Sequence, residues 1–158
     1  MATRNATRRP RLDAAAAAAA TSIRYIESSA LLAALLEQDA DALADLRELG
    51  VRVTSASTFA ETSRALIRAR AAGRITPNEE RQALRALRTF ERRCSVVAVT
   101  GEVLNRCMRP FPVEPIRTLD AIHLATVETL GELPQLVTLV TRDERVRANG
   151  RVLGYAVT

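Results

Sequence analysis

Short apolar segments alternate with longer segments of helical spacing along the chain. Segments 23–26, 51–54, 96–99 and 136–140 are rich in Val, Ile, Leu and Tyr, which is typical of buried strands. Segment 152–157 can add a final strand. Strands that alternate with helices throughout indicate parallel pairing with helices on both faces. The pattern therefore predicts an α/β fold: a three-layer α/β/α sandwich around a central, mostly parallel sheet.

Helix starts and stops are marked by capping residues and glycines. The clearest start is Thr76-Pro77-Asn78-Glu79, with a capping Thr, Pro at the first position and an acid at the third. A serine before Ala30, Ser57 or Thr58, Thr100 and Thr118 are expected to cap other helices, and Gly50, Gly73 and Gly131 to end them. The predicted helices are 30–36, 39–49, 58–72, 77–92, 101–108, 119–130 and a short one after Asp143.

Length and composition favour one domain, residues 23–158, because 158 residues with 47% apolar content can bury one core. Residues 1–22 are expected to be a disordered or partly helical tail. Segment 7–12 is similar to a twin-arginine export signal, but seven alanines follow where a strongly apolar region is needed. No stretch approaches the roughly 18 apolar residues that span a membrane. We therefore expect a soluble, cytoplasmic protein without membrane contact.

The cysteines and the net charge give little information about function. Cys94 and Cys107 form no metal-binding motif, so we expect free thiols in a reducing compartment, with a secreted disulfide as the alternative. The net charge is +5, but four arginines and one aspartate in segment 1–13 contribute +3 of it. The remainder is nearly balanced, and charge alone gives only a weak signal for nucleic acid.

Four acids follow strands or open the next helices. Glu27 follows the first strand and Asp143 follows strand 136–140, whereas Glu61 and Asp120 lie in early turns of helices. Ligands of such sheets bind at the carboxyl ends of the strands, so we expect the four carboxylates to converge there. Each acid taken alone is better explained as a cap or a surface charge that the helix dipole favours than as a ligand.

Converging carboxylates repel one another unless a cation joins them. Oxygen ligands favour Mg²⁺, with Mn²⁺ as a substitute, and one histidine with two scattered cysteines makes a structural zinc site improbable. Such a metal activates water and neutralises charge on a phosphodiester. The chemistry that these residues serve best is phosphodiester hydrolysis.

The sequence around these acids resembles PIN domains. Segment 25–31 (YIESSAL) is similar to the family's opening strand and Asp-Ser-Ser/Thr-Ala motif, and Glu61 occupies the place of its second acid. Segment 119–126 (LDAIHLAT) closely matches the third motif, and segment 140–145 (VTRDER) looks like the fourth. The resemblance covers residues 23–158, and the size and pattern are similar to VapC-type toxins.

This resemblance implies a Mg²⁺-dependent endoribonuclease, the toxin of a type II toxin–antitoxin pair. It implies that Glu27, Glu61, Asp120 and Asp143 are the catalytic and metal-binding residues, that a cognate antitoxin inhibits the protein, and that the protein forms a homodimer. Ser28 or Ser29, and Thr141, are expected to assist. The family usually carries Asp where this chain has Glu27, whose extra methylene moves the carboxylate by roughly 1.5 Å.

Other interpretations remain open. The first is a degenerate PIN-like domain that binds RNA or a protein without catalysis, which the change at Glu27 favours. A flap-type DNA nuclease usually carries more acids, and a response-regulator-like domain needs a Lys, which this chain lacks. His123 is expected to be a packing residue rather than a catalytic one. The arginine rows at 64 and 68 and at 81, 85, 88 and 92 fit a solvated face, with RNA phosphates or an acidic antitoxin segment as the alternative.

Overall fold

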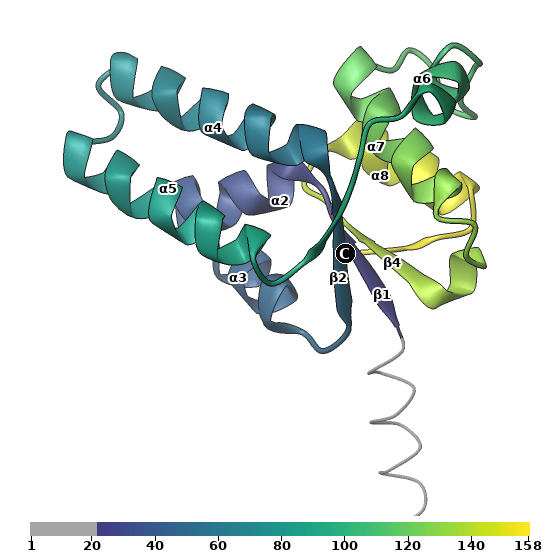
Figure 1. The fold of residues 1–158 in the computed structure, drawn as a ribbon, viewed down its shortest axis with the longest axis horizontal. Helices are drawn as coiled ribbons and strands as arrows, with labels where there is room; N and C mark the ends of the chain where they lie inside the picture. Colours follow the sequence, from purple (N-terminus) through teal and green to yellow (C-terminus); the bar gives the residue numbers. More distant parts are fainter. Residues whose placement is uncertain (1–21) are drawn as a thin grey trace, which may run out of the picture.

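The computed structural model describes residues 22–158, which build a five-stranded parallel sheet (Figure 1). The strand order is β3-β2-β1-β4-β5. The predicted tail lies outside the described residues apart from Ser22, as does the segment similar to an export signal. The strands are β1 (Ile23–Ile26), β2 (Val51–Ser55), β3 (Ser95–Val97), β4 (Val137–Val140) and β5 (Ala156–Val157).

Helices cover both faces of this sheet and complete the predicted three-layer sandwich. Helices α2 to α5 lie on one face and α6 to α8 on the other (Figure 1). No helix within residues 22–158 is long and apolar enough to cross a bilayer. The helices are α2 (Ser28–Leu32), which continues as the π-helical turn η1 (Ala33–Glu37), α3 (Ala40–Arg47), α4 (Ala56–Ala71), α5 (Pro77–Glu91), α6 (Gly101–Cys107), α7 (Thr118–Thr129), the 3₁₀ turn η2 (Pro134–Leu136) and α8 (Glu144–Val152).

The direction of winding reverses between β1 and β4. From β1 the chain moves outward to β2 and β3, then returns to pair β4 with the other side of β1. In register, Tyr25 lies opposite Val53 on one side and Leu139 on the other. The reversal leaves a crevice at the carboxyl ends of these strands, where parallel sheets bind ligands.

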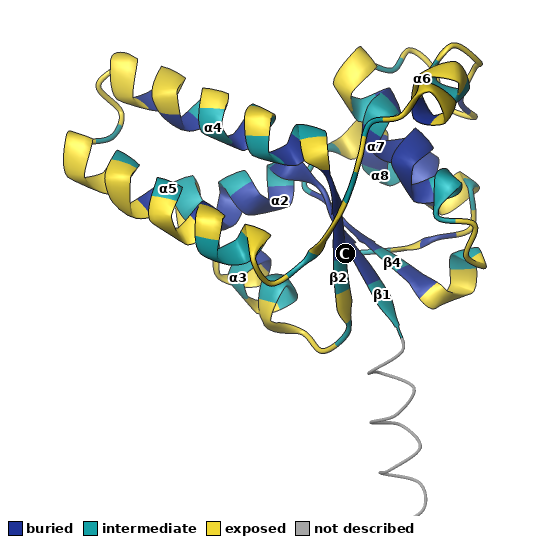
Figure 2. Ribbon diagram, viewed as in Figure 1, coloured by how far each residue is buried: buried dark blue, intermediate teal, exposed yellow. Residues whose placement is uncertain are grey.

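The core has two parts because strand side chains alternate between the faces of the sheet. Tyr25 and Leu139 pack into the cluster under α6 to α8, whereas Ile26 and Val140 pack under α2 and α5. All four are fully buried. Figure 2 shows the buried positions along the central strands and on the helix sides that face them. Burial on both faces explains why β1 and β4 read as nearly continuous apolar runs, whereas the edge strand β3 is mostly exposed.

Two predicted caps are wrong. Glu27, not a serine, caps α2, and its carboxylate accepts a hydrogen bond from the N–H of Ser29. Ser55, not Ser57 or Thr58, caps α4, and its hydroxyl oxygen accepts from the N–H of Ser57. In both places the helix begins immediately after the strand, so the residue at the strand's end performs the capping.

A third cap differs, whereas the clearest one is confirmed. The cap of α7 is Arg117, which makes no side-chain capping bond, and Thr118 already lies inside the helix. At α5 the Thr76 side chain accepts from the N–H of Glu79, and the Glu79 carboxylate accepts from the N–H of Thr76. A reciprocal capping box depends on local sequence alone, which is why its prediction succeeds.

The final strand is shorter than predicted. Helix α8 continues through Val152, and only Ala156 and Val157 pair with β4. Gly154, at φ +90°, lies in the turn between them, a conformation that L side chains rarely adopt. The apolar segment 152–157 is therefore divided between a helix end and a short strand.

The close packing of α8 on the sheet gives a first prediction. A Cβ atom at Gly150 would lie 2.6 Å from Cδ2 of Leu139 and 3.2 Å from Cγ2 of Val157. We expect Gly150→Ala to lower the free energy of unfolding in urea by about 1–3 kcal/mol, because a packed core resists added volume. At Gly101, where nothing lies within 4 Å of an added Cβ, the same substitution should leave stability unchanged or slightly raised. Equal effects at both sites would contradict the tight packing of α8.

Candidate active site

The four predicted acids lie at the carboxyl ends of the central strands, where the winding reverses. Glu27 directly follows β1, and Glu61 lies in the second turn of α4, the helix that follows β2. Asp120 lies in the first turn of α7, and Asp143 caps α8 just after β4. The acids thus come from four different elements, each of which is fixed by its attachment to the sheet or to its neighbours.

Glu27 is buried, with 3% of its surface exposed, yet its carboxylate is fully hydrogen-bonded. Oε1 accepts from the hydroxyl of Ser28 at 2.6 Å. Oε2 accepts from the Ser29 N–H at 3.0 Å, from the Thr141 hydroxyl at 2.9 Å, and from the hydroxyl of Ser29. Donors of this kind offset the cost of burying a charge. Glu27 therefore links β1, α2 and the end of β4.

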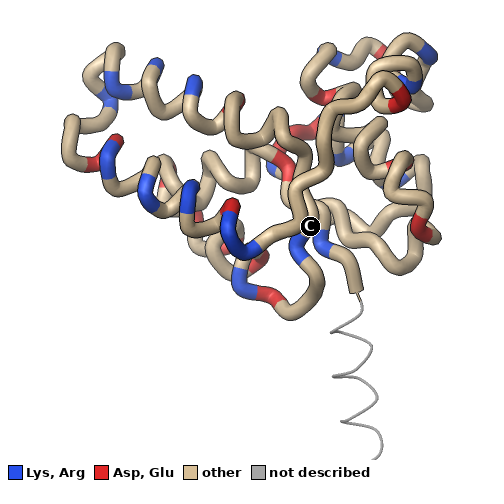
Figure 3. The backbone as a smooth tube through the Cα atoms, viewed as in Figure 1, with Lys and Arg blue, Asp and Glu red and all other residues tan. Residues whose placement is uncertain are grey.

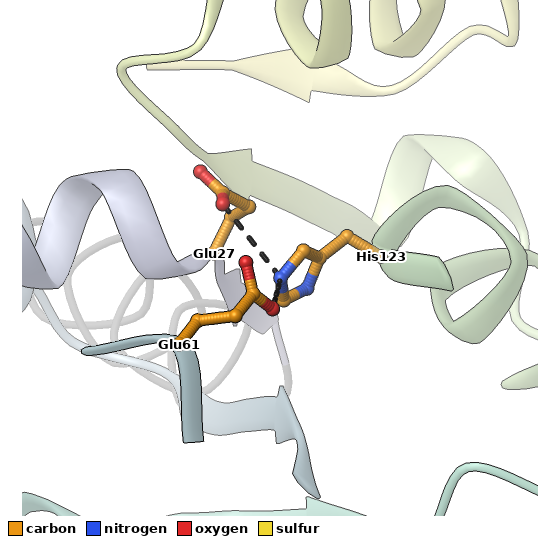
Figure 4. A group of neighbouring side chains, drawn as sticks. All are labelled: Glu27, Glu61 and His123. Carbon is orange, nitrogen blue, oxygen red and sulfur yellow. Dashed lines mark hydrogen bonds and ion pairs between the residues drawn. The ribbon is translucent and has the colours of Figure 1, made fainter. Parts of the chain in front are cut away.

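Glu61 is held by a histidine that is itself held by a core tyrosine. Nε2 of His123 lies 2.9 Å from Oε1 of Glu61 and 3.7 Å from Oε1 of Glu27. On the other side of the ring, Nδ1 lies 3.0 Å from the hydroxyl of Tyr25. Figure 4 shows the imidazole from α7 pointing between the two carboxylates. The hydroxyl of Ser28 also lies 3.1 Å from Oε2 of Glu61, so the two carboxylates share its one proton.

The electrostatics of this pair favour opposite charges. Burial alone would raise the pKa of Glu61, but the hydrogen bond and charge of His123, with bonds from Ser28 and Ser57, lower it. Burial opposes protonation of His123, yet the hydrogen bond to Glu61 and the nearby carboxylates raise its pKa above 6.5. In the imidazolium both ring nitrogens donate, Nε2 to Glu61 and Nδ1 to the Tyr25 oxygen.

Asp120 is compensated less, by a backbone hydrogen bond from Arg117 and by the charge of that arginine, which lower its pKa only in part. Its Oδ2 atom is buried and has no hydrogen-bond partner among the described residues. Burial, then the charges of Asp143 and Glu27, raise the pKa of Asp120. Oδ1 of Asp143 accepts hydrogen bonds from the N–H groups of Arg145 and Val146 at the start of α8. Asp120 therefore carries the unbalanced part of the repulsion among the acids.

This arrangement suits a cation. Glu27, Glu61 and His123 each offer one ligand atom, and the three atoms lie within 4.8 Å of one another. Asp120 and Asp143 lie outside this triangle, but Asp120 interacts electrostatically with Glu27 and Asp143. A buried carboxylate oxygen without a partner, beside other carboxylates, is an unfavourable arrangement that a divalent cation corrects. The residues therefore fit an oxygen-rich metal site.

His123 is the member of this cluster that the sequence interpretation assigned to packing. Its side chain is fully buried, as that interpretation requires, but it also contacts Glu61 and lies near Glu27. The available signal was its spacing, because residues three apart on a helix share a face and Asp120 precedes it by three. Its partners Tyr25 and Glu61 are far away in sequence, so the contact itself could not be read from the chain.

Comparison with known proteins decides the family. The model of the PIN domain matches residues 24–152, nearly the whole described part. The chain belongs to the PIN domain family. Two curated relatives, both from Mycobacterium tuberculosis, are ribonuclease VapC35, 35% identical over 137 residues, and ribonuclease VapC46, 40% identical over 139 residues. Each alignment covers 84% of this chain and 93% or 94% of the relative.

Solved structures show the same fold. VapC20 from Mycobacterium tuberculosis, described as a toxin that cleaves the sarcin–ricin loop, is 17% identical with a TM-score of 0.60. The match covers 84% of this chain and 96% of that chain. VapBC2 from Rickettsia felis, bound to a promoter DNA fragment, is 13% identical with a TM-score of 0.59, covering 86% and 97%. The predicted PIN-like architecture and the resemblance to VapC-type proteins are confirmed.

The His123–Glu61 pair gives a pH prediction for this PIN domain. Since the folded state raises the pKa of His123, its stabilisation is fully present below pH 6.5 and is lost as pH rises through the raised value. We expect the thermal midpoint of EDTA-treated protein to fall across that interval, and His123→Gln, which cannot titrate, to remove this fall. The cysteine thiols, with raised pKa values, titrate only at higher pH. Parallel pH profiles for the two proteins would contradict the ion pair.

Proposed function

We propose that this PIN domain is a Mg²⁺-dependent endoribonuclease and the toxin of a type II toxin–antitoxin pair. The observation that carries the proposal is the gathering of acids where the winding reverses, with Oδ2 of Asp120 buried and without a hydrogen-bond partner in the described part of the chain. Curated relatives that carry the name ribonuclease support the choice of RNA as substrate.

The proposed metal ligands are Glu27, Glu61, Asp120 and Asp143, with Mn²⁺ as a substitute for Mg²⁺. Bound there, the metal would lower the pKa of a water molecule and neutralise charge on the phosphodiester. The chain's own polar groups hold the ligands in place. Ser28, Ser29 and Thr141 orient Glu27 through its two oxygens, and His123 orients Glu61. Partners of ligands in such positions fix geometry and tune affinity.

The proposed partners follow the same family. A cognate antitoxin fits the VapBC complexes among the structural neighbours, from Rickettsia felis and from nontypeable Haemophilus influenzae. We further propose a homodimer in the cytoplasm, with residues 23–158 as a single domain.

A second candidate is a degenerate PIN domain that binds RNA or protein without cleaving. Glu27 favours it, because both of its carboxylate oxygens are already occupied by Ser28, Ser29 and Thr141. A carboxylate that must cap α2 has fewer free lone pairs for a metal. The two candidates differ in one measurable property, since the degenerate domain binds no divalent cation tightly.

The nuclease is tested with total cellular RNA, Mg²⁺ and sequencing of the new RNA ends. We expect discrete cuts that disappear with EDTA and with Asp120→Asn. Because this substitution removes a destabilising charge at nearly constant shape, the thermal midpoint of the metal-free variant should stay the same or rise. Loss of cleavage with unchanged or higher stability is the signature of a functional carboxylate. Intact, folded wild-type protein that makes no metal-dependent cuts would favour the degenerate domain.

Shortening Glu27 tests how the chain tolerates its unusual first acid. We expect Glu27→Asp to retain or improve Mg²⁺ and Mn²⁺ affinity and RNA cleavage. Aspartate is also a good helix cap, and it returns the side chain to the length that PIN domains usually have at this position. Glu27→Gln is the matched control: it keeps the size and an acceptor for Ser29 but loses the charge, so cation binding should weaken. Calorimetric titration measures both, and loss of binding in Glu27→Asp would overturn this interpretation.

A further inference from the structure

A cavity of about 350 Å³ opens directly beside the acid cluster, along α4. Ser28 and Glu61 form the end that belongs to the site. Arg64 and Arg68 line it further along α4, and Leu32 and Leu119 contribute apolar surface. Ala60 and Ala65 complete the lining, and we call this hollow the α4 groove. It is continuous with the site because Glu61 is a wall of both.

The arginines of the α4 groove are free to bind an anion. Both are exposed, and within residues 22–158 neither takes part in an ion pair, whereas Arg70 on the same helix contacts Glu80 at 4.0 Å. Basic residues recur along α4 in Figure 3. Glu61, Arg64 and Arg68 are spaced three and four apart, so they share one helix face. With 1.5 Å of rise per residue, they form a row about 10 Å long that leads away from the site.

The facing wall is apolar and accessible. Leu119 is 47% exposed although it precedes Asp120, and Leu32 is half-buried. A row of cations beside an apolar surface suits a single nucleic-acid strand, whose phosphates can contact the cations while an unstacked base contacts the apolar surface. A paired duplex hides its bases, whereas single-stranded RNA offers them. An acidic peptide with apolar side chains could also contact these residues, but the continuity of the groove with the acid cluster through Glu61 favours the polymer that the site would cut.

We infer that the α4 groove is the substrate track of the proposed nuclease. Arg64 and Arg68 bind successive phosphates of single-stranded RNA on one side of the bond to be cut, and Leu32 and Leu119 contact an unstacked base. The inference rests on the proposed function, because it takes RNA as the polymer that enters the site at Glu61. It assigns the substrate a direction along α4 and a preference for unpaired RNA.

The test compares two double variants with the same change in charge. Arg64→Gln with Arg68→Gln removes the row in the groove, and Arg81→Gln with Arg85→Gln removes two exposed arginines of α5 that are also four residues apart. Binding of a labelled single-stranded RNA oligonucleotide is measured in EDTA over a range of salt concentrations. We expect the groove variant to weaken binding about tenfold or more and to reduce the salt slope by about 1.4, since each phosphate contact on a single strand contributes about 0.7. The α5 variant should change binding less than about twofold.

Cleavage kinetics give a second readout. With Mg²⁺, the groove variant should raise KM by a similar factor and leave kcat within about twofold, because these contacts bind the ground and transition states alike. Equal losses in the two double variants, or an unchanged salt slope, would overturn the track. So would a groove variant that keeps its RNA affinity but no longer binds a polyglutamate peptide, since the groove would then serve an acidic protein.

The outcomes separate this inference from the proposed function. If wild-type protein makes no cuts but binds single-stranded RNA through Arg64 and Arg68, the nuclease fails and the groove stands as an RNA site. If the protein cuts RNA and the groove variant matches wild type, the nuclease stands and the track is wrong. Equally tight binding of a duplex of the same length would overturn the contact between base and apolar wall.

Discussion

Repulsion among carboxylates at one edge of the sheet is the constraint that organises this molecule. Parallel strands bring Glu27, Glu61, Asp120 and Asp143 to that edge, where burial strengthens their mutual interaction. The chain offsets this repulsion to different degrees at the four acids. Hydroxyl and N–H donors surround Glu27, an imidazole pairs with Glu61, and the start of α8 uses Asp143 as a cap. Of these four acids, only Asp120 keeps a buried oxygen without a hydrogen-bond partner among the described residues.

The same contacts serve folding and chemistry. Glu27 caps α2 while it lies in the acid cluster, and His123 fills a buried position of α7 while its imidazole contacts Glu61. The hydroxyl of Tyr25 completes the chain of contacts from the centre of the sheet to the site. A substitution at any of these residues therefore changes both stability and site geometry, and only paired variants separate the two effects.

Most of the fold could be predicted from local sequence. The central strands β1 and β4 could be predicted because burial on both faces makes them nearly continuously apolar. The capping box at Thr76 needs only its own four residues. The positions of the acids followed from one rule about parallel sheets. Two predictions failed because they depend on residues far away in sequence. The caps at Glu27 and Ser55 depend on where β1 and β2 end, which pairing with neighbouring strands determines. The role of His123 depends on its contacts with Tyr25 and Glu61. Spacing along a helix places a side chain on a face but does not name its partner.

The uneven compensation also determines what a cation contributes. Donors from the chain already form hydrogen bonds with the carboxylates of Glu27 and Glu61, so the fold does not need a metal to offset these two charges. Small domains that fold only around a metal ion differ in this respect. The unbalanced charge is at Asp120, so removal of that charge and binding of a cation relieve the same strain. Stabilisation by the metal should accordingly be large in wild type and small in Asp120→Asn, since a ligand stabilises a protein only to the extent that it binds the folded state. Of the proposed ligands, Asp120 is therefore the one whose charge a bound cation would offset most.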